Sequence, residues 1–129
     1  MKQLKLRPAT PEDSKELVQW LNSNPLNEFE SVILKYPTLR VIASYAPDRV
    51  ICYLPTQKVL VLESLAVNPK ASGLEKAQAV TDLTKAAELL ASSEGIRELW
   101  FLDGAGGLGA VAEKHGFELL PYKVYRMKL

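Results

Sequence analysis

A long apolar segment followed by a long amphipathic helix is the feature that most constrains the fold of this chain. Residues 58–67 are apolar on both faces, which is typical of a central strand. After Asn68-Pro69, leucine, valine and alanine recur along one face of a helix over residues 70–94, and Gly95 can cap its end. Leu99-Trp100-Phe101-Leu102 is apolar again and indicates a buried strand within residues 97–102. This order predicts a right-handed crossover between two parallel strands.

The remaining segments predict a mixed α/β sheet in the order β-αα-βββ-α-β-α-ββ. Alternating residues indicate half-buried strands, and Thr10-Pro11 and Asn24-Pro25 are helix starts. Pro47-Asp48 is a turn between two apolar segments, which predicts a hairpin. In chain order, we expect a strand at 2–7, helices beginning at 10 and 24, strands at 38–45, 50–54 and 58–67, a helix at 70–94, a strand at 97–102, a helix ending at 114, and strand segments within 117–129.

The composition predicts a single domain over residues 1–129. The chain has 129 residues, and its 16 Lys+Arg against 15 Asp+Glu leave a formal charge of +1, without the basic excess of nucleic-acid-binding proteins. Cys52 and one histidine provide few soft ligands for zinc. No apolar run reaches the ~18 residues of a membrane-spanning helix, and charges interrupt the N-terminus where a signal peptide would be apolar. We therefore expect a cytoplasmic protein that binds no metal, nucleic acid or membrane.

Two motifs resemble the GNAT (Gcn5-related N-acetyltransferase) family. They are Leu65-Ala66-Val67-Asn68-Pro69 before the long helix and Glu113-Lys114-His115-Gly116-Phe117 near the C-terminus. The opening Leu6-Arg7-Pro8-Ala9-Thr10-Pro11-Glu12-Asp13 is also similar to a common GNAT start, and the element order matches over essentially the whole chain. The resemblance implies a GNAT-like fold and acyl transfer from acetyl-CoA, or another acyl-CoA, to an amine of a small molecule or a protein. Homodimers are common in such folds, with the C-terminal strands as a candidate contact.

The resemblance also implies where the acyl-CoA would bind. Backbone groups of Leu65 and Val67 would bind the pantetheine arm, and the diphosphate would lie at the N-terminus of the long helix. Within the family's phosphate-loop positions, the candidate binding residues are Ser72, Gly73, Lys76 and Ala77.

Two residues of this loop depart from the family pattern. Ser72 replaces a long donor side chain, and Glu75 replaces a glycine that lets the backbone approach phosphate. A carboxylate repels a diphosphate by about 1 kcal/mol per pair at solvated distances. The sequence therefore indicates a divergent member with an eroded diphosphate loop, which Lys70 and Lys76 could partly compensate.

Glu63 and Tyr122 are the candidate catalytic residues. Glu63 interrupts an apolar strand face, where desolvation would raise its pKa towards that of a general base, and in GNATs an acid on this strand sometimes has that role. The alternative is a structural glutamate paired with Arg40 or Arg97, or one that faces solvent. The family's tyrosine acid falls at Ala112, so Tyr122 is the substitute candidate. Its alternative is aromatic packing across strands.

The glycine loop Gly104–Gly109 matches the pattern GxGxxG. Only 20 residues follow it, too few for a second half of a dinucleotide-binding fold. The remaining interpretations are a flexible turn before a short helix, and an anion-binding loop beside the CoA cleft.

Two functions follow from the sequence. The first is an acyl-CoA-dependent N-acyltransferase in which the amine attacks the thioester directly. The second is a catalytically inactive GNAT-like domain that serves as a binding or assembly module. A complete fold favours the first, and the departures at Ser72, Glu75, Ala105 and Ala112 favour the second.

Overall fold

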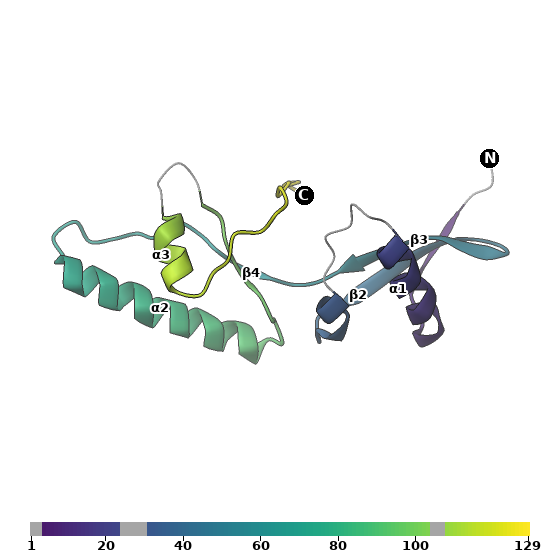
Figure 1. Ribbon diagram of the computed structural model, residues 1–129, viewed down its shortest axis with the longest axis horizontal. Coiled ribbons are helices and arrows are strands. Elements are labelled where there is room, and N and C mark those ends of the chain that lie inside the picture. Colours follow the sequence, from purple (N-terminus) through teal and green to yellow (C-terminus); the bar gives the residue numbers. More distant parts are fainter. Residues whose placement is uncertain (1–3, 24–30, 104–107) are drawn as a thin grey trace. The chain divides into compact units, whose positions relative to one another are not determined.

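The computed structural model describes residues 4–23, 31–103 and 108–129. The chain divides into two compact units, Met1–Lys58 and Val59–Leu129 (Figure 1). The predicted mixed α/β class is confirmed, because the first unit contains antiparallel strands and the second contains a parallel pair. That residues 1–129 form a single domain stays a prediction.

The first unit is a three-stranded antiparallel sheet with a helix. The strands β1 (Lys5–Pro8), β2 (Arg40–Ala46) and β3 (Arg49–Thr56) lie in the order β1-β2-β3. A single 3₁₀ turn, η1 (Pro11–Asp13), leads into α1 (Ser14–Ser23), and η2 (Ser31–Lys35) is a second 3₁₀ helix. The predicted hairpin is confirmed, since Ala46 pairs with Arg49 across the Pro47-Asp48 turn.

The core of this unit lies between the sheet and α1. Ala43 in the middle strand is fully buried, and Leu17 of α1 is 5% exposed. The rings of Trp20 and Tyr53 pack with centroids 5.3 Å apart and planes tilted by 48°, and this contact joins α1 to β3. Burial of the apolar side of the helix against the apolar face of the sheet stabilises the packing of these two layers.

The second unit contains the predicted crossover. The strand β4 (Leu60–Leu62) leads through residues 63–72 to α2 (Gly73–Ser93), and β5 (Leu99–Phe101) pairs in parallel with β4. A short helix, α3 (Gly109–Lys114), follows. In Figure 1, α2 is the long green helix and α3 the short yellow-green one.

Both helices of this unit end at a left-handed glycine. Gly95 has φ 72° and Gly116 has φ 91°, a backbone conformation that costs other residues energy. After α2, the Ile96 N–H donates to the Ala91 carbonyl, and after α3 the Phe117 N–H donates to the Ala112 carbonyl. These bonds satisfy carbonyls that the helix end would leave open. The Gly95 cap predicted from the sequence is confirmed.

Two strand predictions were wrong. The predicted strand 58–67 pairs only over Leu60–Leu62, because β5 offers a partner of only three residues. Residues 117–129, all described, form no strand; Pro121 lacks the N–H that a central strand would donate, and the chain bends there. The predicted helix start at Asn24-Pro25 lies outside the described residues, and residues 31–35 after it form 3₁₀ helix instead of α-helix.

None of the helices in the described parts of the chain has the length and apolar character that crossing a bilayer requires.

Candidate functional site

The residues predicted to bind the pantetheine arm lie between β4 and α2. Leu65 is 43% exposed and Val67 is 51% exposed. Within the part of the chain that the structure describes, the backbone groups of these two residues form no hydrogen bond. Since β4 stops pairing at Leu62, this stretch offers open N–H and C=O groups to an extended ligand.

In the turn after this stretch, backbone N–H groups donate to oxygen atoms of the same turn. The Lys70 N–H donates to the Asn68 side-chain oxygen at 2.9 Å, and the Ala71 N–H donates to the Asn68 carbonyl at 3.1 Å. Asn68 therefore shapes the turn in the way that asparagine commonly does, by mimicking backbone with its side chain.

The first turn of α2 is closed by a reciprocal cap. The Glu75 N–H donates to Ser72 Oγ at 3.1 Å, and the Ser72 N–H donates to Glu75 Oε1 at 3.0 Å. These bonds lower the pKa of Glu75, chiefly through the backbone N–H of Ser72 and also through its side chain. The carboxylate is thus charged at neutral pH and lies at the positive end of the helix dipole.

The other predicted residues of this loop lie in the same turn. The Lys76 N–H donates to the Ser72 carbonyl at 3.0 Å, and the Lys76 and Ala77 side chains are exposed. A Cβ added to Gly73 would meet no atom within 4 Å, so the space beside this position is open. The structure therefore places Ser72, Gly73, Lys76 and Ala77 together at one helix end.

The role of Glu75 was not predicted from the sequence. There it was interpreted as a repulsive carboxylate in an eroded phosphate loop, whereas in the structure it forms half of a helix cap. The signal was present, since Ser72 followed three residues later by Glu75 matches the S-x-x-E pattern of a capping box.

Glu63 does not have the environment that the sequence predicts. It follows the last residue of β4 directly and is exposed, and among the described residues of its unit it forms no ion pair. The expected desolvation is therefore absent, because the strand ends before this position. Its role as a base stays a prediction.

Tyr122 lies in the C-terminal segment, after α3. It follows Pro121 in a bend and lines a hollow of about 830 Å³ formed by β5, α3 and residues 115–124. The rings of Phe101 and Phe117 pack edge-on beside this hollow, with centroids 6.2 Å apart. Glu63 is not among the lining residues, so the structure does not bring the two candidate catalytic residues into one hollow.

His115 links α3 to α2. A carbonyl can only accept, so His115 Nδ1 carries a proton and donates to the Val111 carbonyl at 2.9 Å. The other ring nitrogen lies 3.3 Å from Thr81 Oγ1. Both ring nitrogens of His115 therefore have structural partners.

A polar cluster in the first unit was not anticipated by the sequence analysis. Asp13 accepts two bonds from the Arg7 guanidinium, at 2.7 and 3.2 Å, and one from the Thr10 N–H at 2.7 Å. The Tyr53 hydroxyl lies 3.0 Å from both Asp13 Oδ1 and Glu16 Oε1. The Arg7 side chain and the Thr10 N–H hold the pKa of Asp13 well below its usual range, and burial, followed by the two carboxylates, raises that of Tyr53.

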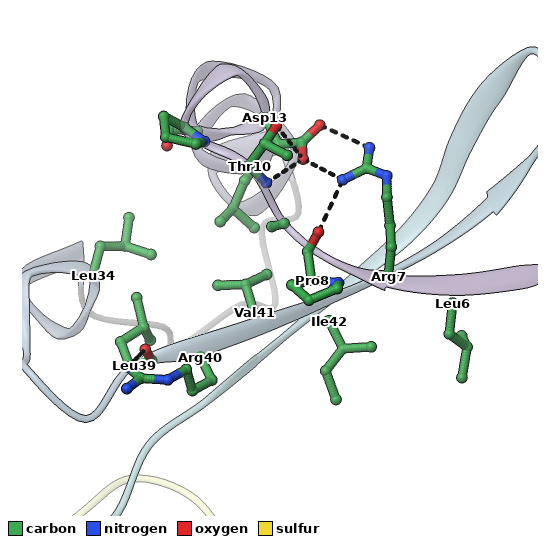
Figure 2. A pocket seen from close by; sticks show the side chains of 14 residues that line it. Leu6, Arg7, Pro8, Thr10, Asp13, Leu34, Leu39, Arg40, Val41 and Ile42 are labelled. Atoms are coloured by element: carbon green, nitrogen blue, oxygen red, sulfur yellow. Dashed lines mark hydrogen bonds and ion pairs between the residues drawn. The ribbon is translucent and has the colours of Figure 1, made fainter.

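The cluster borders a hollow of about 660 Å³ between β1, β2 and the start of α1. Figure 2 shows bonds from Arg7 and Thr10 converging on Asp13, with Leu34 and Val41 among the apolar side chains. The polar groups of the cluster bond to one another. The arrangement therefore anchors the helix start to the sheet and does not present a reactive group.

The described residues contain no group of histidine, cysteine, aspartate and glutamate side chains that could hold a metal ion. Residues 104–107 of the predicted glycine loop, which include Ala105, lie outside the described residues.

The comparisons with known proteins gave matches among solved structures. No family model and no curated protein sequence matches the chain. The chain is similar to aminoglycoside N-acetyltransferase AAC(6')-Iy in complex with CoA, with 18% identity, coverage of 97% of this chain and 99% of that chain, and a TM-score of 0.44. It is also similar to a "predicted acetyltransferase with acetyl-CoA" from Clostridium acetobutylicum, with 13% identity, coverage of 97% and 96%, and a TM-score of 0.43.

A ribosomal-protein-alanine N-acetyltransferase from Brucella melitensis biovar Abortus 2308 matches with 9% identity, coverage of 98% of this chain and 99% of that chain, and a TM-score of 0.38. By their names, these three proteins are acetyltransferases.

Proposed function

We propose that this chain is an N-acyltransferase that moves an acyl group from acetyl-CoA or a related thioester to an amine of a small molecule or a protein. One observation carries the proposal: the open backbone around Leu65 and Val67, between β4 and α2 of a parallel crossover. This is the segment to which the GNAT resemblance assigns the pantetheine arm.

The chemistry of pantetheine supports this assignment. The arm is extended and carries two amides, each with one N–H and one C=O. An unpaired backbone presents the complementary groups and can bind such a ligand through main-chain hydrogen bonds. Exposed side chains at Leu65 and Val67 also provide apolar contact for the methylene groups of the arm.

The reaction is a direct transfer. The amine nitrogen attacks the thioester carbonyl carbon, the C–N bond forms and the C–S bond breaks. The amine loses a proton to a base, and the leaving thiolate gains one to become a thiol. In this proposal Glu63 accepts the first proton, directly or through water, and Tyr122 supplies the second.

No observation on the described residues supports the alternative of a catalytically inactive binding or assembly module. The cap at Glu75 concerns the diphosphate end of a donor and leaves the backbone beside Leu65 and Val67 open. The cytoplasmic location expected from the composition and the homodimer expected from the resemblance stay predictions.

Binding and turnover test the proposal. We expect acetyl-CoA at a hundredfold excess over its Kd to stabilise the protein by about 2.7 kcal/mol in thermal or chemical unfolding. Thiol release with a panel of primary amines reports turnover. Because Cys52 is exposed and its thiol would react with the same reagent, the assay uses Cys52→Ser as the background protein.

Two variants test the assigned residues. We expect Glu63→Gln and Tyr122→Phe each to lower kcat by about a hundredfold with little change in KM, since each removes a proton transfer. Glu94→Gln and Tyr125→Phe are matched controls, because both residues are exposed and lie outside the proposed chemistry. The proposed function is wrong if millimolar acetyl-CoA gives neither stabilisation nor thiol release with any amine.

A further inference from the structure

The start of α2 does not fit the nucleotide end of CoA. A diphosphate at a helix N-terminus is held by backbone N–H groups that have no partner within the helix. Here the N–H groups of Ser72 and Glu75 donate to each other's side chains, and the Lys76 N–H makes the first bond within the helix, to the Ser72 carbonyl. In the described structure, this leaves the N–H groups of Gly73 and Leu74 in the first turn.

The charge at this helix end also opposes a diphosphate. The Glu75 carboxylate occupies the position in which an anion is stabilised by the helix dipole, so a diphosphate there would meet a like charge. Lys70 and Lys76 are close in sequence, but both side chains are exposed. As solvated point charges they are screened by salt and form no built phosphate site.

The segment before the helix differs from the helix end in its backbone hydrogen-bonding groups. The backbone groups of Leu65 and Val67 have no partner in the described residues, whereas the donors of the α2 cap are already used. A ligand that combines a pantetheine arm with a nucleotide therefore meets open backbone for the first part. For the second part it meets a helix end with two open N–H groups, those of Gly73 and Leu74, and the like charge of Glu75.

From this misfit, which rests on the proposed function, we propose that the chain recognises its acyl donor through the pantetheine arm and not through a diphosphate at α2. A pantetheine thioester without the nucleotide is then as good a ligand as acyl-CoA. The substrate class is pantetheine thioesters in general, with acetyl-CoA as one member.

Calorimetry on the unmodified chain tests this directly. Titrations with acetyl-CoA and with S-acetylpantetheine should give Kd values within about threefold of each other, because a helix end capped by the Glu75 carboxylate adds little affinity for a diphosphate. Adenosine bisphosphate, which is the nucleotide portion of CoA, should not displace either thioester. Acetyl-CoA binding more than about tenfold tighter than S-acetylpantetheine overturns the inference and leaves the proposed function standing.

Three variants locate the cause at Glu75. Glu75→Ala removes the charge and frees the Ser72 N–H, so acetyl-CoA should bind about fivefold tighter while S-acetylpantetheine is unaffected. Glu75→Gln keeps a capping side chain without the charge and should give a smaller gain for acetyl-CoA. Glu94→Gln removes one negative charge at the other end of α2 and should change neither Kd.

The outcomes separate the two proposals. Equal binding of both thioesters by the unmodified chain, with a gain for acetyl-CoA alone in Glu75→Ala, supports the inference. An unchanged ratio in Glu75→Ala overturns the role assigned to this carboxylate. If neither thioester binds the unmodified chain, the proposed function itself is overturned.

Discussion

At the scale of single residues, Asp13 connects three parts of the first unit. It accepts bonds from Arg7 of β1, from the Thr10 N–H before η1, and from the Tyr53 hydroxyl of β3. Its side chain is 13% exposed, and two nitrogens of the guanidinium donate to its two oxygens as a bidentate pair. A pair of this kind contributes more to stability than an exposed one, because solvent and salt screen it less.

We expect Asp13→Asn to lower the free energy of unfolding by about 2 kcal/mol at neutral pH, because it removes a charged acceptor. The pKa of Asp13 is lowered in the folded chain, first by Arg7 and then by the Thr10 N–H. The stabilisation is therefore present above the ordinary aspartate pKa of about 4 and is lost as the pH falls below it. Urea denaturation at neutral and acid pH measures both values.

The control for this prediction is Asp48→Asn. The Asp48 side chain is 69% exposed in its pair with Arg49, so its substitution should change the free energy of unfolding by less than about 0.5 kcal/mol. A destabilisation by Asp13→Asn that is as large in acid as at neutral pH contradicts the prediction.

At the scale of elements, α2 is closed at both ends by local signals. Ser72 and Glu75 cap its start, and Gly95 ends it in a left-handed conformation. Such caps satisfy backbone groups without any contribution from the rest of the fold. The family-like sequence Glu113–Phe117 has a physical basis of the same kind, since Gly116 ends α3 and directs Phe117 back to the ring of Phe101.

We expect Ser72→Ala to lower the free energy of unfolding by about 1 kcal/mol, because the Glu75 N–H loses its acceptor. Ser92→Ala is the matched control: Ser92 is an exposed serine of the same helix whose hydroxyl makes no bond within the described residues. Alanine should be neutral or slightly stabilising there. Equal effects of the two substitutions in urea denaturation would show that the cap contributes nothing.

At the scale of the whole molecule, the two tryptophans allow the single-domain prediction to be tested. Trp20 lies in the first unit and Trp100 in the second. Trp20→Phe leaves Trp100 as the fluorescent probe, and Trp100→Phe leaves Trp20. A single cooperative domain unfolds with coincident transitions by both probes.

We expect Leu17→Ala, which shortens a side chain only 5% exposed, to destabilise the first unit by about 3 kcal/mol. If residues 1–129 are one domain, the urea midpoint reported by Trp100 falls together with that of Trp20. A midpoint at Trp100 that does not move would instead mean that the second unit unfolds by itself.

Several features were predictable from the sequence because they depend on neighbours along the chain. The Pro47-Asp48 turn, the helix α2 and the Gly95 cap are each encoded within a few residues, and all three are confirmed. The predicted apolar face of α2 is not, because its residues Leu74, Leu83 and Leu90 are exposed. The parallel pairing of β4 and β5 was also predictable, since a strand, helix and strand in series have few ways to pack.

Other features depend on distant parts of the chain. Asp13 and Tyr53 are 40 positions apart, and neither residue carries a local sign of the bond between them. The length of β4 depends on how much of β5 is available to pair, and this leaves Glu63 exposed where an apolar pattern indicated burial. Turns, caps and periodicity thus follow from local sequence, whereas strand extent, side-chain burial and long-range hydrogen bonds arise only when separate segments meet and exclude water.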